Sequence, residues 1–178
     1  MKATFLALAI AGGLTSAAFA QSVSEKTGVN SLLGIAPRTE DFIKEAATSD
    51  MLEIEAAKIA QEKGSADEKK FAEQMIKDHS ETSSELKQMV PSNLKSAIPT
   101  SLDDSSRKNL DKLRDVKADE FADDYDRMQV DAHQDAVSLF ERYAKGGDDS
   151  QLKEWAGKTL PKLQHHLQMA QQLEKSHK

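Results

Sequence analysis

Four stretches of this sequence repeat apolar residues at alternating steps of three and four positions, and this spacing constrains the fold more than any other feature. Side chains spaced in this way share one face of an α-helix, which is buried when helices pack together. Only 8 Gly and 4 Pro interrupt the 178 residues, and no stretch has the alternation of a half-buried strand. The sequence therefore predicts an all-α fold. The four stretches run from about Glu40 to Lys63, Ser65 to Val90, Asp119 to Lys145 and Asp149 to Leu173.

Capping residues mark the ends of the first two predicted helices. Thr39 is a candidate N-cap and Gly64 a candidate stop for the first helix. Ser65 and Glu68 have the spacing of a capping box, which opens the second helix, and Pro91 ends it. Because Gly64 alone separates the two helices, we expect them to form an antiparallel hairpin.

The second pair of helices is bounded in the same way. Asp119 is a candidate cap for the third helix, and Gly146-Gly147 stops it. Asp148 and Asp149 then offer caps for the fourth helix. Pro161 lies within that helix, and we expect it to kink the helix or to shift its register.

A long polar connection joins the two pairs of helices. It runs from Pro91 to Ala118, and Leu110, Leu113 and Val116 provide enough apolar residues for a short helix. Its length suits a crossover along the bundle, as in ferritin-like folds, and a simple end-to-end return also fits. We predict a ferritin-like four-helix bundle whose long connection, between the second and third helices, contains a short helix. The residues expected to be buried together are Phe42, Met75, Phe140, Trp155 and Leu163.

The N-terminus has the pattern of a secretory signal peptide. Lys2 is followed by an apolar run from Phe5 to Leu14 and by the small-x-small sequence Ala18-Phe19-Ala20. The run is shorter than the roughly 20 residues of a membrane span, although an uncleaved anchoring helix is the alternative. We predict cleavage after Ala20, with residues 1–20 as signal peptide, 21–38 as linker and 39–176 as the bundle domain. The expected product is periplasmic or secreted and has no transmembrane span after cleavage.

Composition excludes several classes of function. The chain has 24 Lys and Arg against 30 Asp and Glu, a formal net charge of −6, so it lacks the basic excess that neutralises nucleic-acid phosphates. Cys is absent, which removes disulfides, thiolate metal sites and Cys nucleophiles. Neither a Gly-rich phosphate loop nor a Gly-x-Ser-x-Gly sequence occurs.

Three of the 5 histidines fall on the inward faces of different predicted helices. His79 is on the second, His133 on the third and His166 on the fourth, while the first supplies Glu53 and, one turn earlier, Asp50. One inward polar residue per helix is how bundles build metal sites. Counting from the turns at 1.5 Å per residue places His166 roughly 7–8 Å beyond the level of the others. We therefore predict Glu53, His79 and His133 as the main ligands, with Asp50 and His166 as candidates to complete the shell.

Buried carboxylates and imidazoles in this arrangement have two interpretations. A divalent transition metal such as zinc, copper or iron would offset the cost of burying the carboxylates. Alternatively, the residues form a structural His–carboxylate network that fixes the packing of the helices. Di-iron bundles carry Glu-x-x-His pairs, but Ile76, Val130 and Leu163 stand three residues before the histidines. This departure disfavours a ferroxidase or an oxygenase.

Four segments of the chain are FIKEAATSDMLEIEAAKIA (42–60), FAEQMIKDH (71–79), VDAHQDAVSLFE (130–141) and TLPKLQHHLQMA (159–170). They resemble an exported bacterial family of ferritin-like proteins with a domain of unknown function, whose members are often labelled membrane or outer-membrane proteins. The Leu-Pro-x-Leu-x-x-His sequence at residues 160–166 is fairly specific. The resemblance implies a ferritin-like bundle whose recurrent polar positions match Glu53, His79, His133 and His166. Ala132 stands where the family usually has an acidic residue.

The sequence leaves two functional classes open. The first is a binding protein that holds a transition metal for storage, buffering or protection against stress. The second is a non-catalytic structural or interaction protein of the cell envelope, with an envelope protein or a second copy of the chain as its partner. Metal analysis of protein purified without a His-tag discriminates between them.

Overall fold

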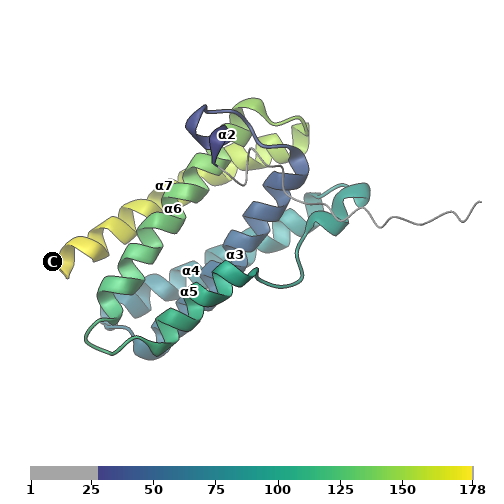
Figure 1. The fold of residues 1–178 in the computed structure, drawn as a ribbon. Coiled ribbons are helices and arrows are strands. Elements are labelled where there is room, and N and C mark those ends of the chain that lie inside the picture. The colour runs from purple at the N-terminus through teal and green to yellow at the C-terminus, as the bar shows by residue number, and fades with distance from the viewer. Residues whose placement is uncertain (1–27, 178) are drawn as a thin grey trace, which may run out of the picture.

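The computed structural model describes residues 28–177, so the predicted signal peptide and the first part of the linker lie outside the described residues. Within this range the regular structure is helical and contains no strand, which confirms the all-α prediction (Figure 1). The α-helices are α2 (Val29–Leu32), α3 (Thr39–Lys63), α4 (Ala66–Met89), α5 (Asp104–Asp115), α6 (Phe121–Gly146) and α7 (Ser150–Ser176), and a 3-10 helix, η1, spans Ser92–Ala97.

The four long helices, α3, α4, α6 and α7, lie side by side and bury two apolar clusters, one toward each end (Figure 1). The larger side chains of the first cluster are Phe42, Leu86, Phe140, Tyr143, Trp155 and Leu163. Those of the second are Phe71, Met75, Leu110, Phe121, Tyr125 and Leu173. Met75 is therefore buried apart from the four residues with which it was predicted to pack. On every long helix, buried polar residues stand between the two clusters, and this polar layer divides the core.

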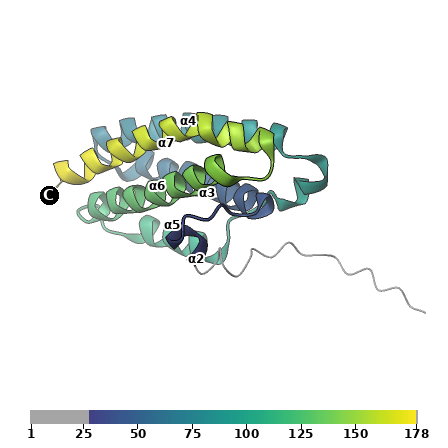
Figure 2. The ribbon, with the colours of Figure 1, turned by 90° about the horizontal axis from the view of Figure 1, so that it is seen from above.

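The order of the clusters along each helix gives the topology. Phe71 lies in the second cluster and Leu86 in the first, so α4 runs from the second cluster to the first. Phe121 and Phe140 show that α6 runs in the same direction. The connection between these helices must therefore return along the length of the molecule, which is the crossover rather than the end-to-end route. Its helix α5 packs on α3 and α6 with its leucines buried (Figure 2).

Two of the predicted helix caps are confirmed. The Ser65 amide donates to Glu68 Oε2 at 2.6 Å, and the Glu68 amide donates to Ser65 Oγ at 3.3 Å, which completes the capping box of α4. The Leu152 amide donates to Asp149 Oδ1 at 2.9 Å, so Asp149 caps α7. The α4 and α7 starts are thus fixed by local hydrogen bonds that the sequence spacing predicts.

Two other predicted caps are wrong. α3 already includes Thr39, whose hydroxyl is within 2.6 Å of the Tyr143 hydroxyl, and Arg38 at the N-cap makes no side-chain cap. α6 begins after Glu120, which makes no side-chain cap either, and Asp119 lies one residue too early. In both cases a tertiary contact or a turn replaces the local cap that the sequence suggests.

Pro161 lies inside α7, which continues through it from Ser150 to Ser176. A proline removes the hydrogen bond to the carbonyl four residues earlier, which here belongs to Gly157. Both Pro161 and Gly157 are exposed, so water can bond to that carbonyl. The helix therefore accommodates the proline without ending.

The segment before α3 runs along the surface of α6. Leu32, Leu33 and Ile35 are exposed by 87%, 67% and 48%, so these apolar side chains do not dock into the core. The segment is held instead by polar contacts, including a 2.9 Å hydrogen bond from Arg142 Nη1 to the Ile35 carbonyl. None of the helices between residues 28 and 177 is long and apolar enough to span a membrane.

Candidate metal centre

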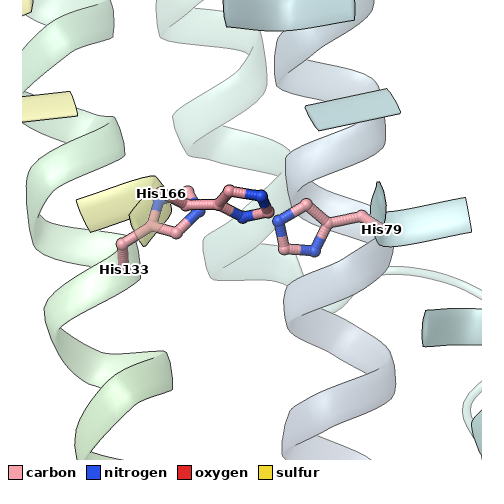
Figure 3. A group of neighbouring side chains, drawn as sticks. All are labelled: His79, His133 and His166. Atoms are coloured by element: carbon pink, nitrogen blue, oxygen red, sulfur yellow. The ribbon is translucent and has the colours of Figure 1, made fainter. Parts of the chain in front are cut away.

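Three histidines from three different helices meet in the polar layer between the two apolar clusters. His79 comes from α4, His133 from α6 and His166 from α7, and Figure 3 shows their rings gathered together. Ring centroids are 5.5–5.6 Å apart, and one ring nitrogen of each residue lies within 4.8 Å of the others. All three side chains are at most 2% exposed. We call these three residues the histidine centre.

His166 is at the level of the other histidines, so the predicted gap of a helical turn or more is wrong. α6 ends at Gly146 and α7 begins at Ser150, which leaves His133 and His166 offset by only about three residues, roughly 4.5 Å at 1.5 Å per residue. Side chains lean toward the N-terminus of their own helix. Because α6 and α7 are antiparallel, the two imidazoles lean toward each other and close this offset.

Each histidine has one ring nitrogen occupied by a partner outside the centre. His79 Nδ1 lies 2.8 Å from Asp50 Oδ1 on α3, and His166 Nε2 lies 2.9 Å from Asp78 Oδ2 on α4. His133 Nδ1 lies 2.8 Å from the carbonyl oxygen of Gln129 on its own helix. Because carboxylates and carbonyls only accept, the ring N–H must be on the nitrogen that faces them.

In each neutral imidazole the opposite ring nitrogen is then a lone-pair acceptor with nothing to accept. His79 Nε2, His133 Nε2 and His166 Nδ1 are buried and have no hydrogen-bond partner among the described residues. A buried polar atom left without a partner costs about 1–3 kcal/mol. Three such atoms in one cluster therefore form a site at which a metal ion, which accepts lone pairs from nitrogen, would be stabilised.

Glu53 adds a carboxylate from the fourth long helix, α3. Its side chain is 1% exposed, and neither carboxylate oxygen has a hydrogen-bond partner in the part of the chain that the structure describes. Its negative charge acts to raise the pKa of both His79 and His133. The ligand atoms that lie within 4.8 Å of one another are those of the three histidines, and Glu53 is not among them.

The three histidines differ in how readily they take up a proton. Burial lowers the pKa of His166 to about 4, against an opposing hydrogen bond from Asp78. Burial also lowers the pKa of His133, and the charge of Glu53 only partly offsets it. For His79 burial acts in the same direction, but the hydrogen bond to Asp50 and the negative charges of Asp50, Glu53 and Asp78 together outweigh it, and the pKa is raised. At neutral pH, His133 and His166 are therefore already in the form that binds a metal.

Asp50 was predicted as a candidate ligand, and its contacts place it behind the centre. Its Oδ1 faces His79 and also accepts a 2.9 Å hydrogen bond from Thr82 Oγ1. Partners of this kind orient a ligating imidazole and raise its basicity. Asp78 has the same relation to His166, and sequence reasoning missed it because it sought one inward polar residue per helix. The available signal was its position beside His79, on the side of α4 that faces α7.

The spacing of apolar residues predicts an inward stripe on α6 of Phe121, Tyr125, Met128, Ala132, Ala136, Leu139 and Tyr143, and the structure buries all of these except Met128 and Ala132. Met128 and Ala132 are only half-buried, because they face the side on which α5 packs. Asp126 and Gln129 are buried instead, with 1% and 0% exposure. His133, four residues after Gln129, lies on the same buried face.

The fold and the centre define an all-helical protein with a buried group of three histidines and carboxylates from the surrounding helices. Residues 18–173 match the family model described as Domain of unknown function (DUF4142), and the chain belongs to this family. No curated protein and no solved structure matches the chain. The match agrees with the resemblance to a family of unknown function.

Proposed function

We propose that this protein binds one divalent transition-metal ion at the histidine centre, with Glu53 as a fourth ligand. The observation that carries the proposal is that three imidazole nitrogens are buried together without hydrogen-bond partners in the described chain. The Glu53 carboxylate on α3 is buried and unpaired as well. A hydrogen-bond network that served packing alone would satisfy these atoms with one another. Here the satisfied atoms are those that face away from the cluster.

The donor set suits zinc, copper or iron. Neutral imidazole and carboxylate bind all three of these metals, and soft thiolate ligands are absent because the chain has no Cys. Asp50, Asp78 and the Gln129 carbonyl would hold the rings in the ligating tautomer. The protein therefore pre-forms the ligand orientation before any metal arrives.

Deep burial favours storage, buffering or stress protection over catalysis. The histidines are 1–2% exposed, so a substrate could not reach a metal held there without opening the helices. The Glu-x-x-His pairs of di-iron enzymes are also missing. A metal held in this way would exchange slowly, which suits a protein that sequesters an ion.

The proposal includes a cellular setting and a fold type. Two features support a ferritin-like four-helix bundle over residues 39–176. One is the crossover between α4 and α6. The other is that each long helix packs against two antiparallel neighbours, in the pairs α3–α4, α6–α7, α3–α6 and α4–α7. The signal pattern at residues 1–20 supports export, with cleavage after Ala20, to the periplasm or beyond. In that compartment the protein would bind metal outside the cytoplasm. It would do so as a monomer, as a homo-oligomer or in contact with another envelope protein.

A structural role is the second candidate, and two hydrogen bonds favour it. Asp50–His79 joins α3 to α4, and Asp78–His166 joins α4 to α7. Such bonds between helices fix their relative register. In this alternative the protein is a non-catalytic envelope component and its polar layer specifies packing.

Metal analysis and thermal melting of untagged protein test the proposal. Wild type and His79→Ala/His133→Ala are melted with and without zinc, copper(II) and iron(II), with His165→Ala as an exposed matched control. We expect a metal to raise the melting temperature of wild type and of the control but not of the double variant. At a hundredfold excess over the dissociation constant the stabilisation is about 2.7 kcal/mol. A wild type that responds to none of the metals, or a double variant that responds equally, overturns the proposal and leaves the structural role.

A further inference from the structure

A second group of ligand side chains lies at the end of the molecule where α4 and α6 begin and α7 ends. Glu68 is in the first turn of α4, Asp126 is near the start of α6, and His177 directly follows α7. One ligand atom of each lies within 4.8 Å of the others. The sequence pattern predicts none of them as ligands, because Glu68 fits a capping box and His177 lies in the C-terminal tail. We call these three residues the end site.

The two carboxylates of the end site are buried and only half satisfied. Glu68 and Asp126 are each 1% exposed. Glu68 Oε2 accepts from the Ser65 amide, and Asp126 Oδ2 lies 2.6 Å from His177 Nδ1. Glu68 Oε1 and Asp126 Oδ1 have no hydrogen-bond partner within residues 28–177. Since buried oxygens normally have partners, two unpaired carboxylate oxygens on residues of one cluster point to a bound water or cation.

A buried tyrosine stands next to Asp126 of the end site on α6. The Tyr125 side chain is 0% exposed, and its hydroxyl has no partner among the residues described. Burial raises the pKa of Tyr125 well above its usual value, and the charges of Glu53, Asp126 and Glu68 act in the same direction. Tyr125 is thus a buried, unpaired polar group directly beside Asp126 in the sequence of α6.

Gln129 continues this line of polar groups on α6. Tyr125, Gln129 and His133 are spaced four residues apart, which places them on one face of the helix, roughly 6 Å apart along its axis. Gln129 is 0% exposed, and both polar atoms of its amide are without partners in the described chain. Tyr125 and Gln129 thus form a buried polar column on α6 that runs from Asp126 of the end site toward His133 of the histidine centre.

We propose that the end site takes up a divalent transition-metal ion from solvent and that the polar column passes it to the histidine centre. His177 is exposed while its two carboxylate partners are buried, so the end site spans the boundary between solvent and core. Two carboxylates and one imidazole form a harder set of ligands than three imidazoles and would bind a transition-metal ion less tightly. This difference suits a site that captures the ion and then releases it to the histidine centre. This inference rests on the proposed function, because the histidine centre is the destination of the ion.

Stopped-flow loading with cobalt(II) tests the inference, because the absorption spectrum of cobalt(II) reports its ligand geometry. The test variant is Glu68→Gln/Asp126→Asn, in which Gln keeps the capping box. Its matched control is Glu73→Gln/Asp131→Asn, which makes the same charge change at exposed positions on the same helices. We expect the histidine centre of the test variant to load at least tenfold more slowly, with its equilibrium affinity changed less than threefold. Loading at the wild-type or control rate overturns the inference.

Two further measurements keep the outcomes separate. If the double variant does not fold by circular dichroism, His177→Ala carries the same test, because it removes the exposed ligand alone. In His79→Ala/His133→Ala we expect one weak cobalt(II) equivalent, which is lost when Asp126→Asn is added. Weak binding at the end site with no tight binding in wild type overturns both the proposed function and the loading role. Tight binding with unchanged loading in the end-site variants leaves the proposed function standing and overturns only this inference.

Discussion

Asp50 on α3 and His79 on α4 are joined by a hydrogen bond of 2.8 Å between buried side chains. The same carboxylate oxygen accepts a hydrogen bond from Thr82, so the carboxylate is held from two positions on α4. The bond fixes the N–H of His79 on Nδ1 and leaves Nε2 as the acceptor within the cluster. In the proposed metal centre, this one contact between two helices would serve both packing and ligand orientation.

Asp50→Asn is expected to weaken metal binding without removing a ligand. The amide can still meet the His79 ring, but it lacks the negative charge that raises the basicity of the imidazole. Changes to partners behind a ligating histidine typically cost 10–100-fold in affinity, and we expect a loss in this range by competition titration with a chromophoric chelator. Asp135→Asn, at an exposed position on α6, is the control. An affinity equal to wild type would show that Asp50 does not act on the centre.

The two apolar clusters predict independent losses of stability. Phe140 lies in the first cluster and Met75 in the second, on opposite sides of the polar layer. Phe140→Ala is expected to cost about 3–5 kcal/mol and Met75→Ala about 2–5 kcal/mol in unfolding free energy. Because the residues share no cluster, their effects should add within about 0.5 kcal/mol in the double variant. Urea unfolding of the four proteins measures this, and strong coupling would contradict the division of the core.

The low pKa of His166 predicts acid sensitivity of the metal-free protein. In the folded chain its pKa is about 4, whereas the unfolded value is near 6.5. Between these two values the unfolded chain binds a proton that the folded chain does not, so stability falls as the pH drops from about 6.5 to 4. The loss is at most on the order of 3 kcal/mol, and His133, whose pKa is also lowered, acts in the same direction.

His79 contributes with the opposite sign and in a different pH range. Its pKa is raised, so its contribution to stability is fully present below about pH 6.5 and is lost as the pH rises through its folded pKa.

Urea unfolding in the presence of a chelator, from pH 8 to pH 4.5, tests the contribution of His166. Because the pKa of His166 is lowered to about 4, stability should decline below pH 6.5. His166→Gln should flatten that decline, while the exposed control His165→Gln should not. An equal slope in all three proteins would contradict the assignment to His166.

The spacing of apolar residues was sufficient to predict the four long helices. Their boundaries could be predicted where they depend on hydrogen bonds between residues close in sequence. The boundaries of α4 and α7 follow from Ser65, Glu68 and Asp149, whose hydrogen bonds join residues three apart in sequence. The start of α3 did not, because Thr39 bonds to Tyr143 more than a hundred residues away. Caps that depend on tertiary contacts leave no signal in a local window.

The candidate site was predicted in its residue types but not in its division of roles. Inward spacing was enough to select His79, His133 and His166, which the structure brings together. A rotation of α3 or α4 by a fraction of a turn decides whether an acidic side chain faces the histidine cluster or lies behind one of the rings, as Asp50 and Asp78 do. The spacing rule also assigned one polar residue to each helix, so it overlooked Asp78 and Gln129. The end site was missed because Glu68 already had a local explanation.

Glu53→Gln separates the two functional candidates because they predict opposite changes in stability. The Glu53 carboxylate is buried without a hydrogen-bond partner in the described chain, and burying an uncompensated charge is costly. If the side chain is there to bind a metal, the neutral amide of the same shape should raise the melting temperature of the metal-free protein. It should also reduce the metal-induced rise in melting temperature. If Glu53 instead completes a structural network with His79, the same change should lower the metal-free melting temperature and leave the metal response absent in both proteins. Differential scanning calorimetry of wild type and Glu53→Gln, with chelator and with zinc, distinguishes the two, and Glu62→Gln at an exposed position of α3 serves as the control.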